Sequence, residues 1–540
     1  MTEAPAATGF GPYYPGAYAA ADAVAGADAV ALISATTGEQ RTFAQVDERA
    51  WQLVRLFRSM GLEAGSHIAV CMENRIELLE LAWGAQYAGL HFTFFSTHLT
   101  AGESAYIIND CGADVVVITP KMAAKLIPEV AEQVRPDVTF YSVGGTVSIP
   151  GDGGVSSDAD ALFDLASAYD GTPIAGAVEG AAMLYSSGTT GQPKGVKRPR
   201  SGNPLGTTCS VGLLCQALLG AGTESVYLCP GPLYHAAPLR FSLDFMAIGS
   251  AVVVMDSFDE EGVLAAIERF GVTHAQFVPT MFIRMLRLPD ETRNRYNLST
   301  LKAAIHAAAP CPVPVKQAMI DWWGPVIHEY YAGSEGIGLT WATSEEWLER
   351  PGTVGRAFVG EIHIVDALDE GTGTELGSGQ EGFIYFSGGA EFEYHNAPEK
   401  TAGAHLNNGW ATLGDYGYLD DDGYLYLVDR RTNLIITGGV NVYPQETEDT
   451  LTGHPAVLDV AVIGVPNDEF GQEVKAVVQV GPDYEAGDAL AAELITYCQN
   501  HLSAIKCPRS VDFRDELPRT PTGKLLKRKL RDEYWAAAES

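Results

Sequence analysis

Short apolar runs alternate with amphipathic, helix-like segments along this sequence, and that alternation restricts the fold more than any other feature. Residues 115–118, 225–228 and 251–255 have the length and composition of buried strands, and residues 261–270 have the apolar spacing of a helix. Strands and helices in alternation build parallel sheets that are covered by helices. The sequence therefore predicts an α/β fold with a substantial parallel sheet.

A second, smaller domain is predicted toward the C-terminus. A chain of 540 residues is longer than one ordinary core can organise. Residues 371–389 combine short strand-like pieces with Gly-rich turns, which indicates a small β subregion. Farther on, two strands at 457–465 and 474–480 and a helix at about 488–502 form an α+β pattern. We expect a large N-terminal domain over residues 1–429, a hinge over 430–434 and a mobile C-terminal domain over 435–540.

The composition excludes several classes of partner. A formal net charge of −33 would repel nucleic acid and anionic membrane surfaces, so no nucleic-acid partner is expected. No apolar run approaches the roughly 20 residues of a membrane-spanning helix, and the N-terminal residues lack the charged and hydrophobic parts of a secretory signal. The eight cysteines include no CxxC pair. We expect reduced, mostly buried thiols, no transmembrane segment and a cytoplasmic location.

The stretch YSSGTTGQPKG, residues 185–195, has the composition of a phosphate-binding loop. Glycines let successive backbone N–H groups converge on one anion, and the Ser and Thr hydroxyls add short donors. The stretch is not a Walker A loop, because Pro193 precedes Lys194 and Gly195 follows it. A flexible, solvated linker has a similar composition, but the apolar run 181–184 leads into the loop as a strand would.

Two groups of basic residues interrupt the acidic composition. One follows the loop and the other lies near the C-terminus. Such runs are usually solvated basic faces, but in so acidic a chain they would also suit one polyanionic small molecule. The two groups are Lys194, Lys197, Arg198 and Arg200, and Arg519, Lys524, Lys527, Arg528, Lys529 and Arg531.

Four further segments join the loop in a fixed order. Together the five segments resemble the adenylate-forming superfamily of acyl-CoA synthetases, nonribosomal-peptide adenylation domains and firefly luciferases, over nearly the whole chain. The resemblance implies that ATP activates a carboxylic acid as an acyl-adenylate with release of pyrophosphate. The four segments are YYAGSEG (330–336), GDYGYLDDDGYLYLVDR (414–430), TGGVNVYPQETE (437–448) and PRTPTGKLLKR (518–528).

The resemblance also implies a role for individual residues. Lys524 would bridge the attacking carboxylate and the α-phosphate, and Glu335 would be associated with Mg²⁺. Tyr331 would stack on adenine, while Asp415 and Arg430, fifteen positions apart, would bind the ribose hydroxyls. The other implied nucleotide contacts are Ser186, Ser187, Gly188, Thr189, Thr190, Gly191 and Lys194 at the β- and γ-phosphates, Ser334 at a phosphate beside Ala332, and Ala307, Ala308 and Ala309 at the base.

Each role has an ordinary structural alternative. Tyr331 fits a core aromatic residue, Asp415 fits a turn residue and Lys524 fits a surface lysine. The chain also departs from the family pattern, which usually has Gly at Ala332 and Thr at Ser334, and Asp or Lys where Thr432 stands in the hinge. The first two changes keep the chemistry, and the third casts mild doubt on domain rotation.

The acceptor of the acyl group is expected to be coenzyme A. The sequence ends sixteen residues beyond Lys524, which leaves no room for a carrier-protein domain and predicts a stand-alone ligase. Gly438 and Gly439 match the segment that the resemblance places beside the pantetheine arm of CoA, and a plain turn between two strands is the alternative.

The acid is expected to be apolar. The segment PLYHAAP (232–238) resembles the acyl-pocket region, where His235 would gate the pocket or orient the carboxylate, unless it is a core histidine. Ala236 stands where adenylation domains for amino acids have an aspartate, and Ala332 and Gly333 leave space. Fatty, aromatic and steroid-side-chain acids stay open, as does the oligomeric state. A luciferase-like oxygenase and a non-catalytic nucleotide-binding protein are the alternative functions. Further apolar neighbours are Ala237, Pro238, Phe241, Phe277, Val278, Pro279 and Met281.

Overall fold

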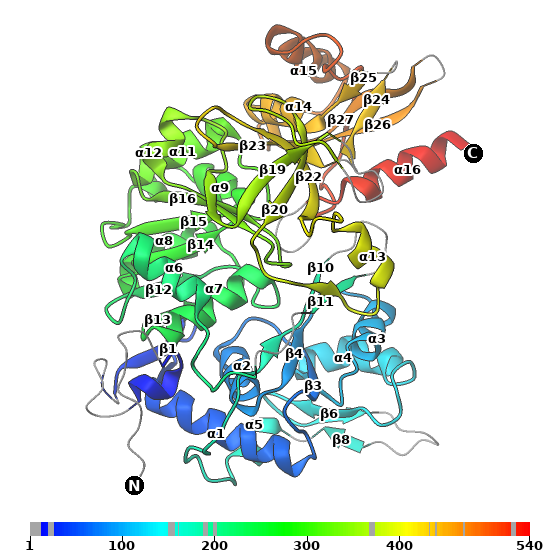
Figure 1. Cartoon of the computed structure of the whole chain (residues 1–540). Coiled ribbons are helices and arrows are strands. Elements are labelled where there is room, and N and C mark those ends of the chain that lie inside the picture. The colour runs from blue at the N-terminus through cyan, green and yellow to red at the C-terminus, as the bar shows by residue number, and fades with distance from the viewer. Residues whose placement is uncertain are drawn as a thin grey trace. The chain divides into compact units, whose positions relative to one another are not determined.

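The chain forms two compact units, and Figure 1 labels many of their elements. Unit 1 comprises Met1–Phe277, Leu288–Ile305 and Glu391–Pro398, and unit 2 comprises Val278–Arg287, His306–Ala390 and Glu399–Ser540. The computed structural model describes residues 12–19, 26, 28–149, 157–159, 161–186, 193–197, 202–366, 373–430, 433–437, 440–467, 470–519 and 525–539.

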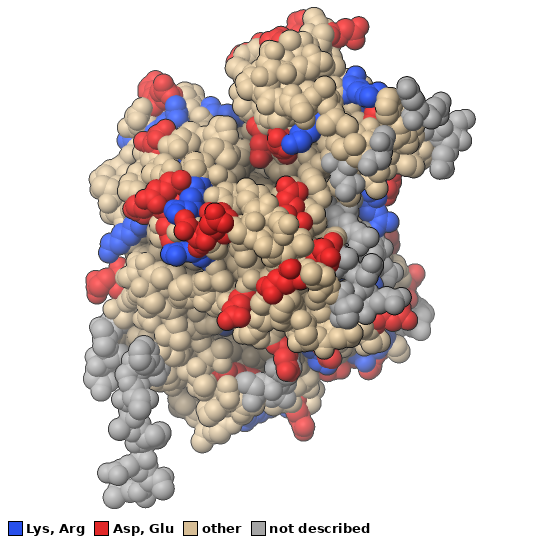
Figure 2. All heavy atoms as spheres, turned by 45° about the horizontal axis from the view of Figure 1, so that its top comes forward, with Lys and Arg blue, Asp and Glu red and all other residues tan. Residues whose placement is uncertain are grey.

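The surface agrees with the acidic composition. On the face drawn in Figure 2, acidic side chains are scattered among uncharged ones, and the basic side chains that can be seen lie mostly near acidic ones. All eight cysteines are free, and all but Cys311 are buried, as the sequence predicts. Within the described ranges, no helix has the length and apolar character needed to cross a membrane.

Unit 1 contains a parallel sheet in the order β6-β5-β3-β4-β9. All four residues of its strand at 115–118 are buried, as expected for a β-branched run that is covered on both faces. Thr100 caps the helix at Ala101–Asp110, which precedes this strand, through a capping box with Glu103. The α/β prediction is confirmed. The elements are β3 (His67–Cys71), α2 (Ile76–Ala88), β4 (His91–Phe94), α3 (Ala101–Asp110), β5 (Val115–Ile118), α4 (Pro120–Val130), β6 (Thr139–Ser142) and β9 (Ala181–Ala182).

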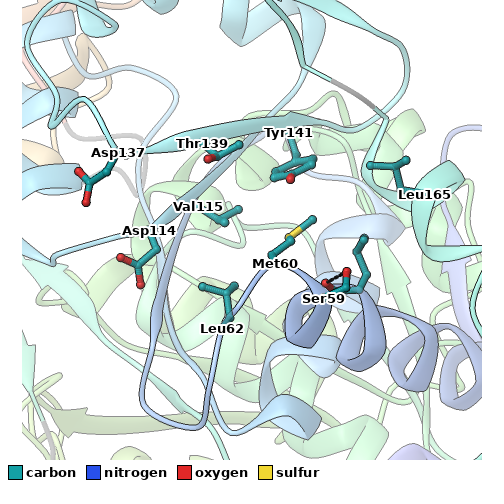
Figure 3. Close-up of a pocket in the computed structure, with 10 residues that line it drawn as sticks. Ser59, Met60, Leu62, Asp114, Val115, Asp137, Thr139, Tyr141 and Leu165 are labelled. Atoms are coloured by element: carbon teal, nitrogen blue, oxygen red, sulfur yellow. Dashed lines mark hydrogen bonds between the residues drawn. The ribbon is translucent and has the colours of Figure 1, made fainter.

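A pocket of about 360 Å³ opens at the amino ends of β5 and β6 (Figure 3). Asp114 and Asp137 lie on its wall, and the Arg135 guanidinium is 3.5 Å and 3.6 Å from their carboxylates. Ligands of parallel α/β sheets bind at the opposite, carboxyl edge of the strands. The pocket contains none of the residues to which the sequence assigns a role.

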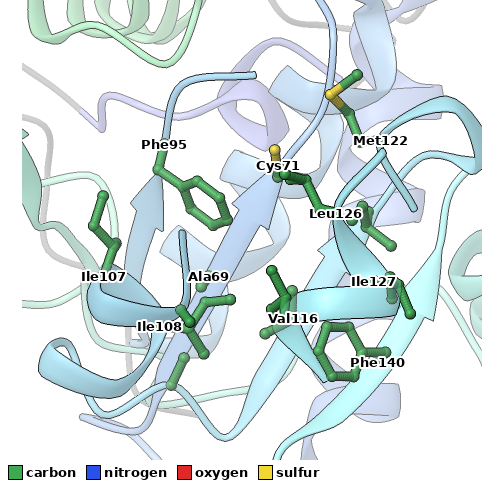
Figure 4. Packing of buried hydrophobic residues seen from close by; sticks show 14 of the residues in the cluster. Ala69, Cys71, Phe95, Ile107, Ile108, Val116, Met122, Leu126, Ile127 and Phe140 are labelled. Carbon is green, nitrogen blue, oxygen red and sulfur yellow. The ribbon is translucent and has the colours of Figure 1, made fainter. Parts of the chain in front are cut away.

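The core of this sheet lies between β3, β5 and β6 and the helices α3 and α4 (Figure 4). Val116 and Phe140 come from the strands, Ile108 comes from α3, and Leu126 and Ile127 come from α4. Burying side chains of this size contributes about 1.5–3 kcal/mol each. A packed core therefore holds the strands whose carboxyl ends form one edge of the sheet.

Unit 1 also contains strands in the order β14-β12-β13-β1-β2, of which only β2 is antiparallel to its neighbour. A hairpin of two short strands, with a third strand from late in the chain, completes this unit. The elements are β1 (Val30–Ser34), β2 (Gln40–Thr42), β10 (Leu184–Ser186), β11 (Lys194–Lys197), β12 (Val226–Cys229), α7 (Ala236–Ala247), β13 (Ala251–Val254), α8 (Glu260–Phe270), β14 (His274–Phe277) and β21 (Glu393–Tyr394).

Unit 2 is richer in antiparallel strands. Strands β16, β17 and β18 pair antiparallel, and a second sheet has the order β19-β20-β22-β23. The second sheet contains the β subregion expected around 371–389. The elements are β16 (Ile327–Ala332), β17 (Leu339–Ala342), β18 (Arg356–Val359), β19 (Glu361–Val365), β20 (Gly382–Ser387), β22 (Ala411–Leu419) and β23 (Leu425–Arg430).

The C-terminal part of unit 2 is the predicted α+β arrangement. Its strands have the order β25-β24-β27-β26, and a fifth strand, β28, pairs with β27. The two predicted strands and the helix are confirmed, and both strands are longer than expected. The division at 430–434 stays a prediction. The elements are β24 (Ile435–Thr437), β25 (Val440–Val442), α14 (Pro444–Thr452), β26 (Val457–Asn467), β27 (Gly471–Val480), α15 (Asp488–His501), β28 (Ser510–Phe513) and α16 (Lys527–Glu539).

Candidate active site

A tyrosine and an aspartate that lie far apart in the sequence meet in unit 2. Tyr331, near the carboxyl end of β16, donates a hydrogen bond of 2.7 Å from its hydroxyl to Oδ2 of Asp415 in β22. Asp415 is buried and pairs in register with Arg430 of the antiparallel β23. Since directly opposed residues of an antiparallel pair have their Cα atoms about 4.5–5.5 Å apart, the chain places an aromatic ring, a carboxylate and an arginine backbone position in one neighbourhood.

The Tyr331 ring is held in place from two further sides. Its backbone N–H donates to the Thr340 hydroxyl at 3.1 Å, and its ring stacks on Phe386 with 6.2 Å between centroids. Gly338 makes this stacking possible, because a Cβ there would lie 1.9 Å from the Phe386 ring. Phe386 and Gly338 lie outside the motif that contains Tyr331, so the sequence pattern does not indicate them.

Glu335 lies in the turn that joins β16 to β17, where the Gly336 N–H donates to the Gly333 carbonyl at 3.1 Å. Its side chain is mostly buried, with 9% of the residue exposed. A Cβ on Gly333 would meet Leu413 Cδ2 at 2.4 Å and Glu335 Oε2 at 2.7 Å. The space that a Cβ on Gly333 would occupy is therefore not empty, because Leu413 and Glu335 fill it. Ala332 and Ser334 flank Gly333 and are partly buried.

The segment Ala307, Ala308 and Ala309 follows strand β15 (Ala303–His306). Ala308 has a φ of 76°, which is rare for a residue with a Cβ. Behind it, the His306 ring is fully buried, neither of its ring nitrogens has a hydrogen-bond partner, and burial holds its pKa well below the usual range. Strained backbone of this kind concentrates at ligand sites, which fits the role that the resemblance implies for these alanines.

The phosphate-loop candidate is flanked by the β10–β11 hairpin in unit 1. Ser186 and Lys194 are register partners at the end of this hairpin. The Lys194 ammonium lies 5.1 Å from the centroid of the Tyr394 ring in β21. Tyr394 lies 200 positions from Lys194 and outside the five motifs, so no sequence pattern indicates it. The residues Ser187, Gly188, Thr189, Thr190 and Gly191 lie outside the described residues.

His235 precedes the first residue of α7 in unit 1. Its Nε2 is buried without a hydrogen-bond partner, and burial, with a smaller effect of His98, lowers its pKa to about 4. The side chain is therefore neutral at pH 7. Ala236 and Ala237 in the first turn of α7 are partly exposed, whereas Phe241 and Phe277 are fully packed in the core.

The predicted C-terminal contacts are not described directly. Lys524, Gly438, Gly439 and Thr432 all lie outside the described residues. Arg519 and Leu525, the described residues on either side of 520–524, form an antiparallel bridge. Lys527 also makes an ion pair of 2.7 Å with the buried Glu448 of α14.

Two family models match the chain. The model for "AMP-binding enzyme" matches residues 19–393, and the model for "AMP-binding enzyme C-terminal domain" matches residues 446–524. The long-chain-fatty-acid–CoA ligase FadD13 of Mycobacterium tuberculosis is 30% identical over 513 residues, which cover 94% of this chain and 95% of that protein. The 2-succinylbenzoate–CoA ligase of Bacillus cereus is 28% identical over 499 residues, which cover 91% and 93% of the two chains.

A solved structure shows the same fold. ATP-bound MatB from Rhodopseudomonas palustris superposes with a TM-score of 0.77 at 28% identity, over 94% of this chain and 95% of that one. The similarity extends over both the N-terminal and C-terminal parts of the chain.

Proposed function

The chain belongs to the family of AMP-binding enzymes, and on this premise we propose that it ligates an apolar carboxylic acid to coenzyme A through an acyl-adenylate. The observation that carries this proposal is the Tyr331–Asp415 hydrogen bond beside the Arg430 position. An aromatic face next to a carboxylate suits a nucleoside, whose base stacks and whose ribose hydroxyls need an acceptor, and Arg430 would supply the matching donor. FadD13 and the 2-succinylbenzoate ligase are both named as acid–CoA ligases, which supports the same reaction.

The reaction has two steps. One oxygen of the substrate carboxylate attacks the α-phosphorus of ATP, a new P–O bond forms, and the bond to the β-phosphate breaks as pyrophosphate leaves. The CoA thiol sulfur then attacks the acyl carbon, the bond from that carbon to the AMP oxygen breaks, and AMP leaves with the electron pair. The thiol proton passes to solvent.

The first step gathers negative charge, and this chain supplies cations and donors for it. Lys194 and the hydroxyls of 186–190 would bind the β- and γ-phosphates. Lys524 would contact the carboxylate and the α-phosphate, where a compact ammonium stabilises the charge that builds up. A single preorganised donor of this kind typically contributes about 3–4 kcal/mol to the transition state.

Mg²⁺ fits a site in which the protein and the nucleotide both supply ligands to the ion. The described residues contain no group of three or more His, Cys, Asp or Glu side chains that could hold a metal. Mg²⁺ usually takes one or two carboxylates together with substrate phosphates, and Glu335 offers one mostly buried carboxylate. When bound there, the ion would neutralise phosphate charge.

The acid is proposed to have an apolar tail. His235, neutral because of its lowered pKa, can orient the substrate carboxylate as a hydrogen-bond donor without adding charge. Ala236 offers no carboxylate for a substrate ammonium, which disfavours amino acids. Fatty, aromatic and steroid-side-chain acids remain the candidates. CoA would approach along Gly438 and Gly439, and a cytoplasmic location stays a prediction.

Two alternatives have distinct outcomes. A luciferase-like oxygenase would emit light with a suitable acid and oxygen. A non-catalytic nucleotide-binding protein would bind ATP without acid-dependent release of pyrophosphate. The presence of Lys524 and Glu335 favours catalysis over the second alternative.

The test is a panel of carboxylic acids that varies in chain length and ring content, assayed with ATP, Mg²⁺ and CoA. We expect CoA-dependent formation of AMP and pyrophosphate with apolar acids and little with amino acids. Release of ADP and phosphate, or no turnover with any acid, would contradict the proposed function.

A further inference from the structure

A short segment from late in the chain is fixed against the hairpin that carries Lys194. Tyr394 pairs with Val196, Glu393 pairs with Lys197, and the His395 N–H donates to the Gly195 carbonyl at 2.8 Å. All of these residues belong to unit 1. The backbone of residues 393–395 therefore pairs with β11, the strand that contains Lys194.

The same segment is attached to the end of α3 through Asp110. The Asn396 amide donates to Asp110 Oδ1 at 3.1 Å, and the His395 ring lies 2.9 Å from the Asp110 carbonyl oxygen. The Tyr185 hydroxyl of β10 donates to the other carboxylate oxygen at 2.5 Å, and burial, together with this hydrogen bond, raises the pKa of Tyr185. Asp110 thus forms contacts with both β10 and residues 395–396.

This anchoring decides where the Tyr394 ring lies. The ring packs edge-on against Phe392, with 5.3 Å between centroids, and its face lies 5.1 Å from the Lys194 ammonium. A cation over an aromatic face is attracted by the electrons of the ring, and the attraction is stronger where solvent is excluded. Lysine has a flexible four-carbon stem, so this attraction is enough to favour one direction of the ammonium.

We propose that Tyr394 is a positioning residue that holds the Lys194 ammonium ready for the β- and γ-phosphates of ATP and for pyrophosphate. The inference rests on the proposed function, because it assigns the phosphates to Lys194. Tyr394 acts through Lys194 and does not itself contact the nucleotide. Its aromatic face, not its hydroxyl, carries the effect.

The test compares Tyr394→Leu with Tyr394→Phe, which keeps the face and removes only the hydroxyl. We expect Tyr394→Leu to weaken ATP and pyrophosphate binding about 3- to 10-fold, and Tyr394→Phe to stay within about twofold of the parent. Binding of AMP, which has no β- or γ-phosphate, should not change in either variant. Tyr484→Leu, at an exposed tyrosine of the C-terminal part, is the matched control.

A double-mutant cycle with Lys194→Ala separates positioning from a general structural defect. In the Lys194→Ala background, Tyr394→Leu should add less than about twofold, because the group that it positions is gone. The readouts are calorimetric Kd values for ATP and AMP, KM for pyrophosphate in ATP–pyrophosphate exchange, and thermal unfolding. An undiminished effect in the Lys194→Ala background, or no effect of Tyr394→Leu on ATP binding, would overturn the inference.

The two failures are distinguishable. If the parent enzyme binds ATP but shows no acid-dependent exchange, the proposed function is wrong, while the ATP Kd values still report on the pairing of Lys194 and Tyr394. If exchange is present and the cycle shows no coupling, the positioning role is wrong and the ligase function stands.

Discussion

Tyr331 and Asp415, 84 positions apart, are joined by a hydrogen bond of 2.7 Å between the phenol and the carboxylate. The contact orders the tyrosine ring and the carboxylate before any nucleotide arrives. The two groups that we assign to the base and the ribose are therefore preorganised by each other.

Tyr331→Phe removes this hydrogen bond and keeps the ring. A hydrogen bond to a charged group contributes about 1.5–3 kcal/mol, part of which the buried carboxylate recovers from other contacts, so we expect KM for ATP to rise about 3- to 10-fold. Tyr331→Ala should be worse, since it also removes the stacking face. Steady-state kinetics with varied ATP checks this, and an unchanged KM in both variants would contradict the assignment.

Gly333→Ala should affect the metal–nucleotide site more than stability. The added methyl group would meet the ends of two flexible side chains, Leu413 Cδ2 at 2.4 Å and Glu335 Oε2 at 2.7 Å. Because side-chain ends can move, we expect a loss of less than about 2 kcal/mol in the free energy of unfolding. The displaced Glu335 carboxylate should raise the Mg²⁺ concentration needed for half-maximal rate. Mg²⁺ titrations at saturating ATP, with urea unfolding as the stability measurement, test both parts.

His235 should make stability depend on pH. Its pKa is lowered by burial from 6.5 to about 4, so between these values the unfolded chain binds a proton that the folded chain does not. Above pH 6.5 the residue does not lower the free energy of unfolding. As the pH falls toward 4, the free energy of unfolding decreases by up to roughly 1.4 kcal/mol per pH unit. His235→Gln should show a shallower loss over that window. Urea unfolding of both proteins at several pH values measures the difference, and equal slopes would exclude a buried neutral His235.

Local sequence patterns predicted several strands, because the composition of a strand and its flanking turns is local information. Residues 115–118 are four β-branched residues, and all four are buried in a parallel sheet. The strands at 457–465 and 474–480 could be located because apolar runs and a Pro/Gly-containing turn are local signals. Their extra length reflects pairing with each other up to Asn467 and Gly471, which depends on the partner strand.

The contacts that order the site could not be predicted in the same way. Tyr331 with Asp415, Lys194 with Tyr394 and Asp110 with His395 each join residues many strands apart. Such pairs depend on how sheets twist and which loops cross, and no spacing rule in one sequence specifies them. The family resemblance identified candidates within its motifs, but it did not identify Tyr394 or Phe386.

Lys527→Met should destabilise the C-terminal part. The Lys527 ammonium is 2.7 Å from Glu448 Oε2, and both side chains are about nine-tenths buried. The other Glu448 oxygen accepts the Val462 N–H at 2.6 Å. Removing the cation leaves a buried carboxylate without that partner, which costs about 3 kcal/mol. Adding Glu448→Gln, which keeps an acceptor for Val462 and removes the charge, should recover part of the loss. Urea unfolding of the three proteins tests this, and additive losses would contradict the pairing.

The last prediction separates the two half-reactions. If Lys524 acts only while the adenylate forms, Lys524→Ala should slow adenylation on the order of 10²–10³-fold and leave thioester formation from a supplied acyl-adenylate nearly intact. Gly439→Leu should do the reverse, because a bulky side chain would block the proposed pantetheine path after the C-terminal domain rotates, while the phosphate contacts of the first step remain. Single-turnover kinetics of each step, with circular dichroism to confirm folding, measures both. Equal damage to both steps in both variants would contradict a mechanism in which one mobile domain presents two faces to one site.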